Sequence, residues 1–243
     1  MTSDASTRPE QNLEIPAGPA AAPQADDQFA AALRGFGPLG ILAILFILAG
    51  NVIVVPLSAV LVLAWARWSR TPWSEIGYRK PWSWLGSAAA GIAFGIAFKF
   101  MMKAIVMPLL GADPINHAFD YLAGNKAALP GILYLVIVGA GFGEETVFRG
   151  YLFERMGKLL GSGVVAKTAI VFLTAGLFGL AHYSLQGLAG VEQAAITGLV
   201  FGTIFAITGR IWMLMIAHAT FDVTAVAIIY WNLESRVAHF VFK

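Results

Sequence analysis

Residues 141–155 read GFGEETVFRGYLFER and directly follow the apolar run ILYLVIVGA of residues 132–140. The segment places two adjacent carboxylates, Glu144 and Glu145, and the guanidinium of Arg149 in a stretch that has the composition of a membrane helix. A charged side chain in hydrocarbon costs a few kcal/mol or more, so it normally faces a protein interior or a water-filled cavity. We therefore expect these three side chains to mark a functional site inside a membrane protein.

The composition of the whole chain supports this class. Of the 243 residues, 58% are hydrophobic and 12% are charged, whereas a soluble domain carries about 25% charged residues. These values predict an all-α fold, a polytopic transmembrane helical bundle of about six to eight membrane helices around a polar intramembrane cavity. The expected spans are residues 39–65, 85–110, 129–160, 164–182, 191–208 and 211–231. The net charge of +2 is too small to indicate nucleic acid, and without cysteine there is neither a disulfide nor a cysteine nucleophile.

The chain divides into a tail and one membrane domain. Residues 1–35 are rich in proline, alanine and acidic residues and are expected to form a disordered N-terminal tail, whereas residues 36–243 form the transmembrane domain. Asn51 and Pro56 lie inside the first span, which predicts one kinked helix over residues 39–65. Lys and Arg gather in the first, third and fifth connections, which places these on the cytoplasmic side and both termini outside.

Helical spacing assigns different tasks to the two glutamates. Glu145 and Arg149 are four residues apart, so they share a helix face and can form an ion pair. Glu144 is rotated by about 100° from its neighbour and points to another wall, which makes it the free carboxylate and a candidate general base. The alternative is that all three side chains form a buried charge network that only holds two helices together.

Two further clusters of ionisable residues lie in apolar helices. They are FGLAH at residues 178–182 and HATFD at residues 218–222, in which His218 and Asp222 are again four residues apart. Either histidine alone would normally be a hydrogen-bonded packing residue. With a free glutamate beside them, His182 and His218 suit either the activation of water or the binding of zinc. His182 is expected nearer the outer end of its span and His218 nearer the inner end. A meeting requires either that the fourth span ends inside the membrane, as a break in the Gly-containing link 184–190 would allow, or that the helices tilt strongly.

Several other residues are expected to have structural roles. The GxxxG spacing of Gly91 and Gly95 predicts close packing of two helices. Lys99 and Lys103 share a helix face, where they either snorkel toward the interface or neutralise a buried carboxylate. His117 lies in a polar loop and is expected to be solvated.

The three motifs together resemble a known family. EETVFR, FGLAH and HATFD are similar to the EExxxR, FxxxH and Hxxx(N/D) signatures of the CPBP intramembrane proteases, and the resemblance covers residues 129–231. This family includes type II CAAX prenyl proteases and the bacteriocin-processing and Abi-like self-immunity proteins. The resemblance implies an intramembrane endopeptidase in which Glu144 activates water with the help of His182. His218 and Asp222 would stabilise the oxyanion, although many relatives have Asn where this chain has Asp222.

The resemblance also implies the supporting residues and the partners. Glu145, Arg149 and Phe178 would hold the site in place. Family members are often classed as metalloproteases, but HExxH is absent and we assign no metal ligand; if zinc is bound, its expected ligands are Glu144, His182 and His218. The expected substrate is a membrane-associated, prenylated or bacteriocin-type peptide or protein, reached from the membrane or the cytoplasmic side.

Besides that substrate, the expected partner is the lipid bilayer, and the expected location is a bacterial cell membrane. An alternative of another class is a non-enzymatic transporter or immunity factor that uses the buried charges as a relay. The chain shows no clear inverted repeat, which argues against a transporter.

Overall fold

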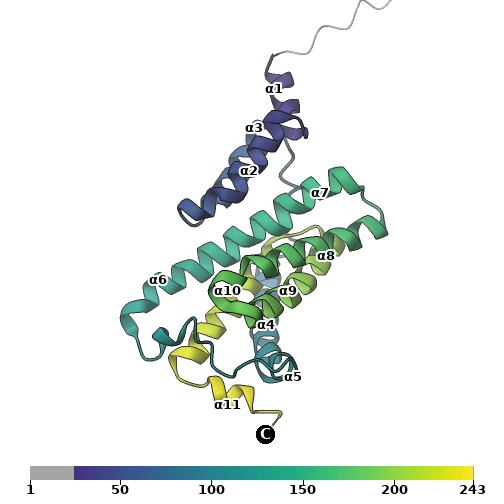
Figure 1. Ribbon diagram of the computed structural model, residues 1–243. Helices are drawn as coiled ribbons and strands as arrows, with labels where there is room; N and C mark the ends of the chain where they lie inside the picture. Colours follow the sequence, from purple (N-terminus) through teal and green to yellow (C-terminus); the bar gives the residue numbers. More distant parts are fainter. Residues whose placement is uncertain (1–24, 243) are drawn as a thin grey trace, which may run out of the picture.

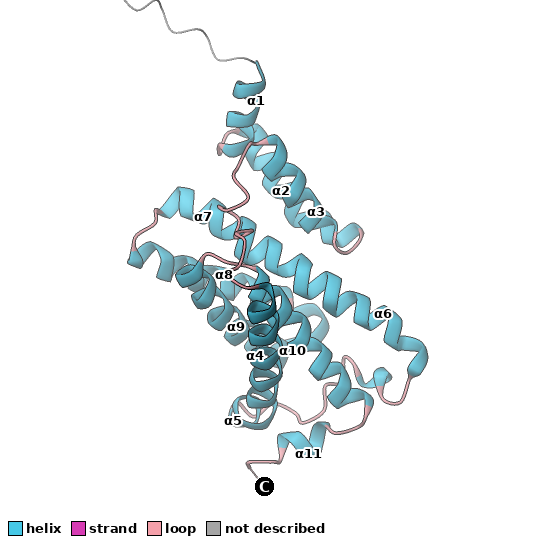
Figure 2. Cartoon of the chain, turned by 180° about the vertical axis from the view of Figure 1, so that it is seen from behind, coloured by secondary structure: helices cyan, strands magenta, loops and turns pink. Residues whose placement is uncertain are grey.

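The computed structural model describes residues 25–242, and every regular element in that range is a helix (Figures 1 and 2). Five helices are long and apolar enough to cross a membrane, or up to six if a bent pair near the start of the described chain is one span. The predicted all-α, polytopic membrane fold is confirmed, with a number of spans at or below the lower end of the expected six to eight.

The first apolar stretch differs from its prediction. It forms two helices, α2 (Pro38–Ile53) and α3 (Leu57–Trp68), which run antiparallel and side by side (Figures 1 and 2). Pro56 lacks an N–H and disfavours a helical conformation in the preceding residue, so the first helix ends before it. The backbone N–H of Asn51 donates to Ser58 Oγ at 2.9 Å, and the backbone N–H of Ser58 donates to Asn51 Oδ1 at 3.0 Å. The prediction of one kinked helix over residues 39–65 is therefore wrong, and this stretch is a helical hairpin.

The hairpin also changes the placement of the N-terminal region. Part of the expected tail forms α1 (Ala25–Arg34), while residues 1–24 lie outside the described residues. The indole N–H of Trp65 donates to Leu33 O at 3.0 Å, and Arg155 Nη1 donates to Arg34 O at 2.7 Å. The start of α2 thus lies at the same end as the connector after α3. α1 and that connector therefore lie at the same end of the hairpin, whereas the sequence predicted opposite sides for them.

That connector, residues 69–83, is fixed to the helix that carries the double glutamate. The hydroxyl of Thr146 donates to Phe142 O at 2.7 Å, so Tyr78 is the donor in the 2.7 Å bond between Tyr78 Oη and Thr146 Oγ1. Burial raises the pKa of Tyr78 to about 12. The phenol therefore keeps its proton, and this hydrogen bond, at neutral pH.

The double-glutamate helix is the longest apolar helix. It is continuous through α6 (Leu129–Tyr134), η4 (Leu135–Leu152) and α7 (Phe153–Leu160), and η4 has the i→i+5 hydrogen bonds of a π-helix. With the short 3₁₀ turn before it the helix has 35 residues, or about 52 Å, which exceeds a bilayer core of about 30 Å and requires tilt. The sequence analysis assumed an α-helix here; π-helices are rare and often occur at functional sites.

The remaining helices complete the bundle. After the connector the chain forms α4 (Trp84–Met101), a π-helical turn η1 (Met102–Val106) and α5 (Met107–Leu109). Two 3₁₀ turns follow, η2 (Asp120–Leu122) and η3 (Lys126–Ala128). The C-terminal half contains α8 (Val164–Ala181), α9 (Tyr183–Thr208), α10 (Trp212–Tyr230) and α11 (Glu234–Ala238). In this half α8 packs on α9, and α10 packs between α4 and η4.

Glycine permits the close approach of α4 and α10, as the GxxxG spacing predicted. A Cβ atom on Gly95 would lie 2.4 Å from Ala217 O, and one on Gly91 would lie 2.8 Å from Met213 O. Both obstacles are backbone atoms, so they cannot move aside as a flexible side chain would. The packing of α10 against α4 thus depends on these two glycines.

We expect Gly95→Ala to destabilise the protein by about 1–3 kcal/mol, the usual cost of overpacking. It should also shift α10, the helix that carries the HATFD motif. Gly176→Ala on α8 is the matched control, because a Cβ there meets nothing within 4 Å. Thermal unfolding of both variants in the same detergent tests the expectation. Equal unfolding temperatures for the two variants would contradict it.

Candidate active site

A cavity of about 340 Å³ lies among η4, α8, α9 and α10. The four side chains predicted to be catalytic all line it: Glu144, His182, His218 and Asp222. The expected conflict in depth between the two histidines does not arise, because α8 ends at Ala181 and the chain turns back beside the cavity. The turn is a break inside α9 at Gly187, whose φ of 62° favours glycine. The Gly-containing link 184–190 therefore contains the break that its glycines allow.

The two glutamates face different surroundings, as the helical spacing predicted. Glu145 is fully buried, and its Oε1 accepts a hydrogen bond from Arg149 Nη1 at 2.8 Å. The Glu144 side chain is 28% exposed, and its Oε2 accepts no hydrogen bond from any described residue. The nearest partner of that oxygen is His218 Nε2 at 3.7 Å. Glu145 and Arg149 form the predicted ion pair, which we call the clamp, and the Glu144 side chain lines the cavity.

The clamp includes a contact to a second helix that the sequence did not indicate. Glu145 Oε1 also accepts a hydrogen bond from His218 Nδ1 at 2.7 Å, between η4 and α10. A carboxylate only accepts, so His218 donates through Nδ1 and presents Nε2 to the cavity. Asp222 Oδ2 lies 3.6 Å from that Nε2, beyond an ordinary hydrogen bond. Glu145, rather than Asp222, therefore fixes the orientation of the imidazole.

His182 is oriented by its own helix. Its Nδ1 donates to Phe178 O at 2.8 Å, since a carbonyl oxygen can only accept. That bond leaves Nε2 as the ring nitrogen able to meet a molecule in the cavity. Both histidines thus use Nδ1 for the protein and keep Nε2 for another partner.

Aromatic rings pack against the arginine and the histidines of the site. The ring of Phe178 lies 4.7 Å from that of His182 and 5.9 Å from that of His218, and Arg149 Cζ lies 4.7 Å from its centroid. Phe201 on α9 contacts the same group, 5.5 Å from the ring of His218. The sequence analysis included Phe178 through its motif. It missed Phe201, which nothing in its local sequence distinguishes from other apolar helix residues.

The residues around the cavity do not converge on a metal site. Among the described residues no three His, Cys, Asp or Glu side chains are grouped so that they could hold a metal ion. The set expected for zinc, Glu144, His182 and His218, lines one cavity without meeting at one point. We therefore assign no catalytic step to a metal.

Lys99 of α4 and Lys103 of η1 have different partners. Lys103 Nζ lies 2.9 Å from Glu234 Oε1 and donates to Pro114 O at 2.6 Å, so it does neutralise a buried carboxylate. Lys99 is also buried and donates to the amide oxygen of Gln193 at 3.2 Å. Neither lysine snorkels, and the sequence analysis did not identify Glu234. His117, as expected, is exposed, with 69% of its side chain accessible.

Comparison with known proteins agrees with these motifs. A family model described as type II CAAX prenyl endopeptidase Rce1-like matches residues 126–224, a range that contains all three motifs. No curated protein and no solved structure matches the chain. Together with the five apolar helices, the family match makes this an integral membrane protein with CAAX-type protease activity in general. Residues 126–224, which contain the three motifs, therefore support the assignment of a CPBP-type intramembrane protease.

Proposed function

We propose that the protein is an intramembrane endopeptidase in which Glu144 activates the attacking water. The observation that carries this proposal is the Glu144 side chain, which lines a cavity together with His182 and His218 and whose buried Oε2 accepts no hydrogen bond from a described residue. A carboxylate without a hydrogen-bond donor can accept a proton from water at that position. His182 Nε2 would hold the same water, because Nδ1 is already bound to Phe178 O.

His218 supplies the second part of the proposed mechanism. With Nδ1–H bound to Glu145, a protonated His218 places an N–H at Nε2, 3.7 Å from Glu144 and 3.6 Å from Asp222. The three surrounding carboxylates stabilise such an imidazolium. Its N–H faces the cavity, where it would stabilise the oxyanion that forms when water adds to a peptide carbonyl.

The proposed reaction is balanced without another reagent. Glu144 takes one proton from water as the oxygen adds to the carbonyl carbon. The C–N bond then breaks, and the proton held by Glu144 passes to the leaving nitrogen to give a free amine. The products are two shorter peptides, and Glu144 returns to its ionised form.

The proposed substrate is a membrane-associated peptide, either prenylated or of the bacteriocin type, that enters from the membrane or the cytoplasmic side. The lipid bilayer is the other proposed partner, and a bacterial cell membrane is the proposed location. Purified protein in lipid nanodiscs should cleave a prenylated peptide whose C-terminal residues carry a quencher, with and without a chelator. No cleavage of prenylated or unprenylated peptides, together with a solute flux that requires Glu144, would favour the relay alternative. Stoichiometric zinc and loss of cleavage on chelation would overturn the metal-free mechanism.

Substitutions of Asp222 test separately whether this residue contributes to stabilising the oxyanion. The amide of asparagine donates a hydrogen bond, as a protonated aspartic acid does, whereas an ionised aspartate only accepts and could contribute to the oxyanion site only through His218. We expect Asp222→Asn to keep kcat within about tenfold of the unmodified protein, and Asp222→Leu to lower it by about 10²-fold, as for loss of an oxyanion contact. Steady-state cleavage in nanodiscs measures both. If Asn is as inactive as Leu, the carboxylate itself is required and Asp222 has another task.

A further inference from the structure

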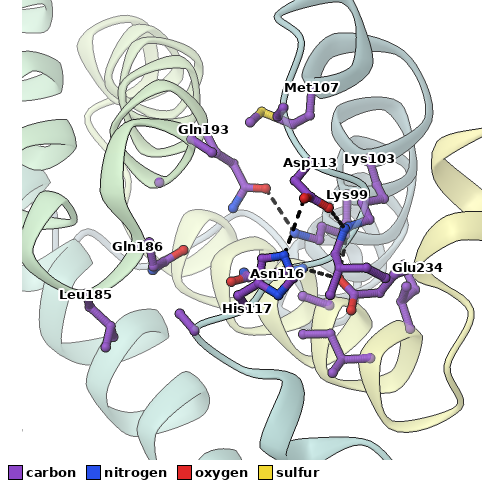
Figure 3. A pocket seen from close by; sticks show the side chains of 18 residues that line it. Lys99, Lys103, Met107, Asp113, Asn116, His117, Leu185, Gln186, Gln193 and Glu234 are labelled. Atoms are coloured by element: carbon purple, nitrogen blue, oxygen red, sulfur yellow. Dashed lines mark hydrogen bonds and ion pairs between the residues drawn. The ribbon is translucent and has the colours of Figure 1, made fainter.

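A second cavity of about 350 Å³ adjoins the catalytic one. It lies among α4, the loop before η2, α9 and α11, and Lys99, Gln186 and Gln193 line both cavities. Figure 3 shows Gln193 meeting Lys99 at this wall, with Lys103 and Glu234 beside them. Lys99 is thus the cationic residue at the boundary between the two cavities.

Lys99 forms no direct ion pair within the described part of the chain. Its side chain is 6% exposed, its Nζ donates to the neutral amide of Gln193, and it lies 4.6 Å from the centroid of the Phe221 ring. No carboxylate in residues 25–242 forms an ion pair with it, in contrast to Lys103 one helical turn away. A buried ammonium group costs several kcal/mol unless a negative charge compensates it. Two of its three N–H groups have no hydrogen-bond acceptor among the described residues.

We propose that Lys99 binds the C-terminal carboxylate of the peptide substrate. This inference rests on the proposed function and specifies where the leaving end of the peptide lies. A carboxylate accepts hydrogen bonds from the two free N–H groups of the ammonium and brings a negative charge into direct contact with it. The Nε2 amide of Gln193, whose oxygen already binds Lys99, can donate to the second carboxylate oxygen.

Paired substrates test the proposal directly. The full-length protein in nanodiscs is given one peptide with a free C-terminal carboxylate and the same peptide with a C-terminal amide. We expect kcat/KM to be about 10–100-fold higher for the carboxylate, as for a hydrogen bond to a charged group. Lys99→Met should remove this preference by slowing cleavage of the carboxylate peptide, and Lys99→Arg should restore part of it.

The ratio of kcat/KM for the two peptides distinguishes a loss of recognition from a loss of folded protein, because partial unfolding lowers both rates equally. Lys103→Met is the matched control: it removes a neighbouring ammonium that is already paired, and it should keep the preference. The proposal is overturned if the unmodified protein cleaves both peptides equally well, or if Lys103→Met rather than Lys99→Met removes the preference. Either result leaves the protease function standing, whereas failure to cleave any peptide rejects the proposed function itself.

Discussion

Replacing Glu144 by glutamine is expected to lower kcat by about 10²–10⁴-fold, the usual contribution of a general base. Glutamine has nearly the same shape as glutamate but cannot take a proton from water. Because Glu144 makes no hydrogen bond to another described residue through Oε2, the change removes no stabilising bond from that oxygen. The loss of activity should therefore occur without a loss of folded protein.

The measurement is cleavage of a quenched peptide under single-turnover conditions, beside thermal unfolding of the same sample. Glu75→Gln is the matched control, because Glu75 is 40% exposed and pairs with Lys158 away from the cavity. It should retain full activity. If Glu144→Gln cleaves at the unmodified rate, Glu144 is not the base and the buried charge network becomes the better explanation of the motif.

Removing the arginine of the clamp should have the largest effect on stability. Arg149→Met leaves the buried Glu145 with His218 as its remaining hydrogen-bond partner. Leaving one partner of a buried ion pair alone costs about 3–5 kcal/mol. We expect a much lower unfolding temperature and little active protein, although Arg149 lies outside the catalytic cavity.

A second variant separates stability from catalysis. In the double variant Glu145→Leu with Arg149→Met, both charges are gone, and a buried apolar pair often costs less than a broken ion pair. It should recover part of the unfolding temperature but stay inactive, because His218 Nδ1 has then lost its acceptor. Unfolding and cleavage of the single and double variants measure both effects. A double variant with normal cleavage would show that Glu145 does not position His218.

The sequence predicted those parts of the site that lie on one helix. Spacing of four residues identified the pair of Glu145 and Arg149, and adjacency in the chain separated Glu144 from it. These predictions succeed because, in a helix, the spacing of two residues in the sequence determines the directions of their side chains around the helix axis. The convergence of three motifs on one cavity followed from the same principle, since intramembrane charges seek a common polar interior.

Contacts between helices were not predictable in the same way. The bond of His218 to Glu145 joins positions 73 residues apart, and no local pattern indicates it. The hairpin was missed because the apolar composition continues through its turn, where Asn51 and Ser58 satisfy each other's backbone groups. Lys99 was recognised as buried or snorkelling, but its lack of a carboxylate partner depends on the position of α11 and of the loop before η2.

The hairpin has one more consequence, for the lipid around the protein. Its tip lines the catalytic cavity through Asn51 and Val55, and Tyr134 holds that tip by a 2.9 Å bond from its hydroxyl to Val55 O. The longer arm has 16 residues, or about 24 Å, less than the roughly 30 Å of hydrocarbon in a bilayer. Because both arms begin and end on one side, the hairpin ends within the hydrocarbon, and lipid beside the cavity meets a tip that carries the polar Asn51 rather than a complete membrane span.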